Sequence, residues 1–181
     1  MPKVKILIKG YCSIDSNGHS CSTVTLVQDA KMKMIVDPGT LKSQKILINA
    51  LKKEKLSVND INVVYITHSH IDHYRNIGMF PKAKSLDFYG WYKGDYWQPC
   101  NRKITKNIKL IKTPGHNSNS TTLLVKTEKG VIAICGDVFW KKDYPKKDSY
   151  ASDPKKLAAS RKKLLKIADY IIPGHGDMFK V

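Results

Sequence analysis

The chain has 181 residues, 41% of them hydrophobic, which is enough to bury a core in a single domain spanning residues 1–181. No window approaches the roughly 18 apolar residues that a membrane span needs, and the alternating charged and apolar residues at the start predict a strand, not a signal peptide. We therefore expect a cytoplasmic protein with no membrane partner. The net charge of +17 favours an acidic partner such as nucleic acid. Because only three of the 32 basic residues are arginines, a solvated lysine-rich surface is the alternative.

The first half of the chain predicts three strands, a helix and a fourth strand. The strands cover residues 4–8, 23–27 and 32–36, and residues 10–22 connect the first two. A helix follows over residues 41–55 with Thr40 as its cap, and its apolar residues fall on one face. The strand at 63–66 is short and apolar. This strand–helix–strand order places whatever follows residue 66 at the carboxyl end of a strand, where open α/β sheets place their sites.

The second half predicts more strands and one further helix. A short helical turn at 74–78 and a weak strand at 85–89 come first, and strands follow at 108–112, 121–127 and 131–135. A basic loop covers 141–152, and Asp153 with Pro154 then opens a helix as its cap and first position. The last predicted strand is 170–172.

Residues 90–106 show no periodicity and predict a long loop that mixes aromatic and basic side chains. Trp91, Tyr96 and Trp97 lie close in sequence to Lys93 and Arg102. Aromatic rings beside cations are what single-stranded nucleic-acid binding needs, for base stacking and phosphate contact. The alternative is an apolar loop that folds down as a lid or fills the core.

The four cysteines form no C-x-x-C pair, and we expect no disulfides. Cys135, in an apolar strand, is expected to be an inert core thiol. Cys12 and Cys21 flank one loop, which leaves a contact between them as the alternative.

The histidines are concentrated at strand ends. His68, His70, Asp72 and His73 follow the strand at 63–66 within six residues, a density of metal ligands that packing alone does not require. His116, Asp137 and His175 each follow a later apolar run. Because these runs end near the same edge of a sheet, the sequence predicts a metal site there; a polar surface loop with scattered histidines is the alternative.

The H-x-H-x-D-H run at 68–73, His116, Asp137 after Gly136, and His175 between two glycines together resemble the metallo-β-lactamase-fold hydrolases over essentially the whole chain. The resemblance implies an α/β fold, a four-layer αβ/βα sandwich in a minimal single domain. Within the superfamily, stretches such as 78–81, 136–139 and 168–176 look closest to the small single-domain members known in animals as a histone pre-mRNA endoribonuclease.

The resemblance also implies two metal ions. It assigns one ion to His68, His70 and His116 and the other to Asp72, His73 and His175, with Asp137 bridging; these seven residues are the expected ligand set. Two Zn²⁺ ions are the first expectation from the histidines, and the hard carboxylates leave Mn²⁺ or iron as alternatives. Two ions sharing a hydroxide generate a nucleophile near pH 7, and Asp72 is a candidate to guide its proton. Asp37, after the third strand, is either a partner that orients a ligand or a plain turn residue.

Asp137 bears on the reaction class. The resemblance implies that true β-lactamases usually lack this carboxylate, whereas phosphodiesterases and thioesterases of the fold keep it. We therefore expect a phosphodiesterase or ribonuclease acting on RNA or single-stranded nucleic acid. The alternative is a hydrolase of a small ester, thioester, lactone or β-lactam. A non-catalytic nucleic-acid-binding module is disfavoured because every ligand is present.

His19 is the one histidine outside these motifs. In relatives, the loop at 10–22 hangs over the metal site, so the resemblance places His19 near a bound substrate. A ring there can donate a proton to the leaving oxygen. The alternative is a solvated loop residue.

Overall fold

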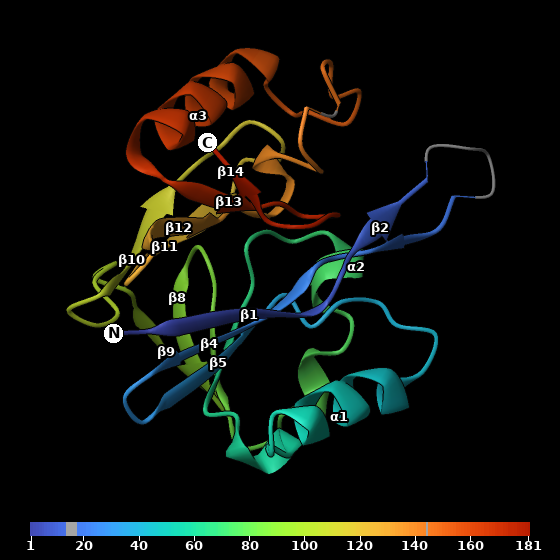
Figure 1. Cartoon of the computed structure of the whole chain (residues 1–181), viewed down its shortest axis with the longest axis vertical. Helices are drawn as coiled ribbons and strands as arrows, with labels where there is room; N and C mark the ends of the chain where they lie inside the picture. The colour runs from blue at the N-terminus through green and yellow to red at the C-terminus, as the bar shows by residue number, and fades with distance from the viewer. Residues whose placement is uncertain (14–17, 144) are drawn as a thin grey trace.

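Two β-sheets pack face to face, and one helix covers the outer face of each. The computed structural model describes residues 1–13, 18–143 and 145–181. Helix α1 (Gln44–Lys53) lies against the first sheet and helix α3 (Pro154–Ile167) against the second, at opposite sides of the molecule (Figure 1). This four-layer α/β sandwich confirms the predicted fold class.

The first sheet has the strand order β1-β4-β5-β6-β7-β8-β9. Its pairs are antiparallel except for β5–β6 and β6–β7, which are parallel. Its strands are β1 (Lys3–Ile8), β4 (Val24–Asp29), β5 (Met32–Val36), β6 (Val63–Tyr65), β7 (Lys84–Leu86), β8 (Gly90–Lys93) and β9 (Tyr96–Pro99). The short helix α2 (Ile71–Tyr74) follows β6, and 3₁₀ turns lie at Val58–Asp60 and Ile77–Met79.

The second sheet has the order β10-β11-β12-β13-β14, and only β12–β13 is parallel. Its strands are β10 (Ile108–Lys112), β11 (Thr121–Thr127), β12 (Gly130–Ile134), β13 (Tyr170–Ile172) and β14 (Phe179–Lys180). A 3₁₀ turn at Gly136–Val138 follows β12. The predicted strand at 170–172 is present, but β14 comes after it, so it is not the last strand.

Alternation along the strands divides the core into three layers. In β11, Leu123 points between the sheets, whereas its neighbour Leu124 points toward α3. In β5, Met34 lies between the sheets and Ile35 packs toward α1. Because successive side chains of a strand face opposite sides, strands covered on both faces are apolar throughout, and this explains the continuous apolar runs in the sequence.

The two long helices differ in how well their starts were predicted. Asp153 caps α3 as expected, accepting a hydrogen bond from the Lys156 backbone N–H at 3.0 Å. For α1 the expected cap was wrong: the helix begins after Ser43, whose hydroxyl accepts from the Lys45 N–H at 3.3 Å. Thr40 instead donates to the Ile71 carbonyl at 3.1 Å and so ties the start of this segment to α2.

Two predicted loops contain strands. Residues 90–99 form the β8–β9 hairpin, turning at Gly94 with a left-handed φ of 61°, so the prediction of a long loop over 90–106 was wrong for this part. Trp91 packs against the core, whereas Trp97 and Tyr96 are 49% and 64% exposed. One part of the hairpin therefore packs against the core and the other is exposed to solvent. The connection at 10–22 likewise contains a small hairpin, β2 (Tyr11–Cys12) with β3 (Ser20–Cys21).

All four cysteines are free thiols. Cys12 pairs with Ser20 and not with Cys21 across the β2–β3 hairpin. Cys135 is buried in the layer under α3, and burial raises the pKa of its thiol far above the usual value, as expected of an inert core residue. Among the described residues, no helix combines the length and apolar character needed to cross a bilayer.

Candidate metal centre

The predicted ligands come together at one edge of the two packed sheets. His68 and His70 follow β6, and Asp72 and His73 lie on α2. From the second sheet, His116 follows β10, Asp137 lies in the turn after β12, and His175 follows β13. The first sheet thus contributes four side chains and the second contributes three.

Two clusters form, divided as the resemblance implies. One holds His68, His70, His116 and Asp137, and the other holds Asp72, His73 and His175; within each cluster the ligand atoms all lie within 4.8 Å of one another. In the first, His116 Nε2 lies 3.0 Å from His70 Nδ1. In the second, His175 Nε2 lies 3.6 Å from Asp72 Oδ2.

Asp137 lies between the clusters. One of its oxygens, Oδ1, is 3.2 Å from His73 Nε2 and 3.2 Å from His175 Nε2, both in the second cluster. The other, Oδ2, is 3.4 Å from His116 Nε2 in the first cluster and 3.3 Å from His175 Nε2 in the second. A carboxylate that contacts rings of both clusters has the arrangement expected of a bridging ligand.

The site fits divalent cations. Two carboxylates and five imidazoles are the donor set that zinc and its first-row neighbours prefer. His68 Nε2 is buried and has no hydrogen-bond partner in the described part of the chain. An unpaired buried nitrogen costs free energy, and a cation beside it removes that cost.

Hydrogen bonds on the side away from the centre orient four of the five histidine rings. His73 Nδ1 lies 2.7 Å from Asp37 Oδ2, and His116 Nδ1 lies 2.7 Å from Asp148 Oδ2. His175 Nδ1 lies 3.1 Å from the Cys21 carbonyl oxygen. Because a carbonyl or a carboxylate only accepts, each of these rings donates from Nδ1, and Nε2 is the nitrogen that faces the centre and can bind a cation once it is deprotonated.

Thr67 extends this arrangement to His68. The Thr67 hydroxyl donates to Asp37 Oδ2 at 2.7 Å, so it accepts from His68 Nδ1 at 3.1 Å and leaves His68 Nε2 facing inward. The Thr67 backbone N–H also donates to Asp37 Oδ1 at 2.8 Å. Asp37 is therefore a partner that orients two ligand rings, not a plain turn residue, and it adopts a left-handed φ of 48° to do so.

Asp148 is the partner that the sequence did not reveal. It lies in the basic stretch 141–152, where no periodic pattern or strand end marks it, yet it is buried beside His116. Ser20 is a second such residue, since its hydroxyl donates to Asp72 Oδ2. A buried polar residue in an otherwise solvated loop can be recognised as part of the site only once the structure shows its partner.

Burial and neighbouring charges set the protonation states of the candidate ligands. Burial lowers the pKa values of His68 and His70, so these rings are neutral, which is the metal-binding form. Burial acts in the same direction on His73 and His175, but the Asp137 charge outweighs it and raises both pKa values. Burial alone would raise the pKa of Asp137; His175 and His73 instead hold it well below the ordinary value, so Asp137 is ionised.

A cavity of about 500 Å³ opens onto the centre. It is lined by His70, Asp72, His116, Asp137 and His175, and on its other sides by Cys12, Ser20, Ile71, Trp140 and Tyr150. The Trp140 and Tyr150 rings lie 5.8 Å apart at 31° and form one wall. Trp140 is buried and Tyr150 is 65% exposed, so the wall runs from the floor of the cavity to its mouth.

His19 lies beside this cavity and not among its lining residues. Its neighbours Gly18 and Ser20 line the metal-site cavity, whereas His19 lines an adjoining one with Tyr11 and Ile46. His19 is exposed, and its backbone pairs with Ser13. The general-acid role stays a prediction, and it requires the ring to turn from one cavity to the other.

Two clusters of histidine and aspartate at the strand ends of a four-layer α/β sandwich define a divalent-metal hydrolase site. A sequence profile of the metallo-beta-lactamase superfamily matches residues 21–89. Metallo-beta-lactamase domain-containing protein 1 of Xenopus laevis is 30% identical over 98% of this chain and 81% of its own length. The chain therefore belongs to the metallo-β-lactamase superfamily and is a metal-dependent hydrolase.

Solved structures agree in fold. A Thermotoga maritima protein assigned to the metallo-β-lactamases is 23% identical and superposes with a TM-score of 0.77 over 99% of both chains. A dizinc quorum-quenching lactonase is 16% identical, with a TM-score of 0.65 over 87% of this chain and 73% of that one. The shared architecture extends over nearly the whole chain.

Proposed function

We propose that the protein is a binuclear metal-dependent phosphodiesterase that cleaves RNA or another single-stranded nucleic acid. The observation that carries this proposal is Asp137, a buried carboxylate that contacts histidine rings of both ligand clusters. The net charge of +17 supports a polyanionic substrate. The resemblance to the histone pre-mRNA endoribonuclease subfamily points the same way.

Seven residues of the chain would hold the ions, two Zn²⁺ in our proposal. His68, His70 and His116 would hold one, Asp72, His73 and His175 the other, and Asp137 would bridge them. Bound there, the ions supply Lewis acidity toward a phosphoryl oxygen and a hydroxide nucleophile near neutral pH.

The protein's own residues position and shield the reaction. Asp37 and Asp148 hold two rings in the metal-binding tautomer, which preorganises the site before substrate arrives. Ser20 donates to Asp72 and fixes that carboxylate, the candidate to guide a proton. The Trp140–Tyr150 wall covers one side of the cavity, offers an aromatic face to a base and keeps water away from that side.

Hydrolysis of a small ester, thioester, lactone or β-lactam is the second candidate. The cavity volume of about 500 Å³ falls within the range of small-molecule sites, and its apolar side chains suit an acyl group. The likeness to a dizinc lactonase supports this candidate at the level of fold.

One experiment separates the two. Purified protein of measured metal content is assayed against a fluorescent single-stranded RNA and against a panel of thioesters and lactones. We expect RNA cleavage that is lost in His116→Ala, with folding checked by circular dichroism. Turnover of a lactone or thioester without any RNA cleavage would replace the first candidate with the second.

A further inference from the structure

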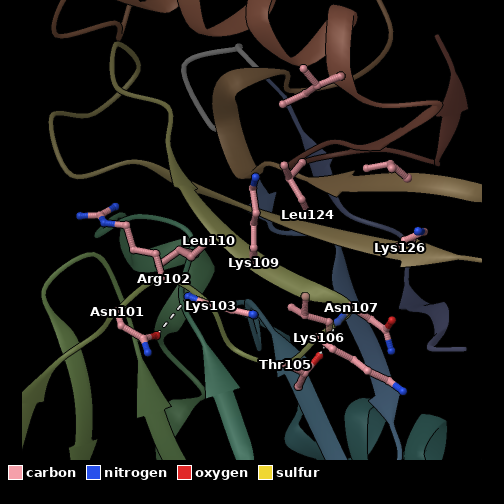
Figure 2. A pocket seen from close by; sticks show the side chains of 13 residues that line it. Asn101, Arg102, Lys103, Thr105, Lys106, Asn107, Lys109, Leu110, Leu124 and Lys126 are labelled. Carbon is pink, nitrogen blue, oxygen red and sulfur yellow. Dashed lines mark hydrogen bonds between the residues drawn. The ribbon is translucent and has the colours of Figure 1, made fainter.

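A basic groove lies at the far end of β10 from the metal centre. It has a volume of about 590 Å³, and Figure 2 shows its lining residues on β10, β11 and the segment 101–107. Its apolar lining includes Leu124, Val131 and Ile167. The cations that line it are Arg102, Lys103, Lys106, Lys109 and Lys126, and none of the described residues lining it is acidic.

The segment that carries these cations is held rigidly. The Leu110 N–H donates to the Arg102 carbonyl at 2.8 Å, and the Lys126 N–H donates to the Asn107 carbonyl at 2.9 Å. Asp29 of the first sheet accepts from the Thr105 hydroxyl at 2.6 Å and from Asn107 Nδ2 at 3.2 Å. The nearby carboxylate of Asp29 is thus engaged in anchoring, and the groove is preorganised, which lowers the entropic cost of binding.

Two features of the groove are energetically unfavourable in the protein alone. Lys103 and Lys109 form an antiparallel β-bridge, so two like charges lie directly opposite each other, an arrangement that destabilises a strand pair. Arg102 adopts a left-handed φ of 66°, a strained conformation for a residue with a side chain. Its Nη1 atom is buried and has no hydrogen-bond partner among the described residues.

Phe88 lies beside one cation of the basic groove and one cation at the other end of β10. The Arg102 guanidinium lies 6.0 Å from the Phe88 ring, and Lys112, at the other end of β10, places its Nζ 4.8 Å from the same ring. Phe88 also lines a cavity of about 220 Å³ together with His68 and Asn119. Phe88 thus contacts one cation of the basic groove and borders a cavity that one candidate metal ligand also lines.

We propose that the basic groove binds the phosphate backbone of single-stranded nucleic acid outside the metal centre. This inference rests on the proposed phosphodiesterase function and adds a second contact region to it. Five cations and no acidic side chain among the described lining residues suit a polyanion, and the apolar lining suits the faces of bases. A groove does not suit a flat membrane surface.

The test compares matched charge variants. Lys103→Gln/Lys109→Gln removes two charges from the basic groove, and Lys45→Gln/Lys82→Gln removes two exposed charges elsewhere. Binding of a fluorescent single-stranded DNA of roughly a dozen nucleotides is measured by anisotropy across a salt series. Losing two phosphate contacts should reduce the salt slope by about 1.4, which corresponds to a loss of about 25-fold in affinity at 0.1 M salt. The control pair should lose far less.

Arg102→Gly gives an independent readout, because glycine relieves the left-handed strain while removing the guanidinium. We expect weaker binding with a melting temperature equal to or above that of the wild type. Lys55→Gly is its control, since Lys55 also has a left-handed φ, of 58°, but lies after α1; it should leave binding unchanged.

Equal losses of DNA affinity in the groove variant and the control variant would overturn the proposal. Displacement of the DNA by poly-glutamate as readily as by unlabelled DNA would also overturn it, because it would indicate an acidic peptide partner. The binding assay is independent of cleavage. If RNA is bound in the basic groove but never cleaved, the phosphodiesterase function fails and the binding site stands. If the groove double variant and the control double variant cleave RNA with the same KM, the binding site fails and the phosphodiesterase function stands.

Discussion

Replacing Asp37 with asparagine tests whether the hydrogen bonds behind the ligand rings set the metal affinity. Asparagine is nearly isosteric and tolerates the left-handed φ of 48° at this position. Its carbonyl oxygen can still accept from the Thr67 N–H, which places the amide NH₂ against His73 Nδ1. Two donors then face each other, and His73 is forced to carry its proton on Nε2, which points into the centre.

The expected cost follows from this change of tautomer. Loss of such a partner typically lowers metal affinity by 10–100-fold, or about 1.4–2.7 kcal/mol. Asp148→Asn acts on His116 in the other cluster, so it should give a loss of similar size. Asp60→Asn, at an exposed capping position, is the matched control and should bind metal normally.

Competition with a chromophoric chelator measures the affinity, and NMR of the imidazole nitrogens reports the tautomer. Circular dichroism checks that each variant is folded. Wild-type affinity in Asp37→Asn, with the His73 proton moved to Nε2, would refute the argument that the tautomer controls binding.

Four further outcomes are expected. Asp137→Ala should lower metal content below two ions per chain by elemental analysis and abolish turnover in a folded protein; unchanged turnover would contradict the bridging role. His19→Ala should slow substrates with poor leaving groups by roughly 10²–10⁴-fold and spare those with good ones, and equal effects on both would make His19 an ordinary loop residue. Trp97→Ala should weaken RNA binding by roughly 1–3 kcal/mol, whereas a melting defect without a binding defect would indicate a packing role. Leu123→Ala, fully buried between the sheets, should lower the free energy of unfolding by about 2–5 kcal/mol in urea titrations.

The candidate ligands could be grouped from the sequence because most of them come shortly after an apolar strand, and a strand end fixes where the next side chains lie. His68, His116 and His175 are all of this kind. Asp148 could not be found in this way, because its loop reaches the site through tertiary packing that no local pattern encodes.

Which strands pair with one another could not be predicted from the sequence either. Parallel neighbours such as β6 and β7 are joined by long connections, so their adjacency depends on the whole sheet. The β8–β9 hairpin was missed for a different reason: Trp91 and Trp97 lie on strands with opposite environments, one facing the core and the other solvent, and this breaks the periodic signal. The turn at Gly94 was the local sign of the hairpin.

The contribution of ligands by both sheets links metal occupancy to folding. The ligands are spread over residues 68–175, so neither sheet alone can assemble the two clusters. Contacts so distant in sequence form late and slowly. An ion that binds only after the sheets have docked stabilises that docked state by mass action, about 2.7 kcal/mol at a free concentration 100 times its dissociation constant. Bound metal would therefore stabilise the interface between the sheets, and in a cell the lifetime of the folded chain would follow the supply of metal.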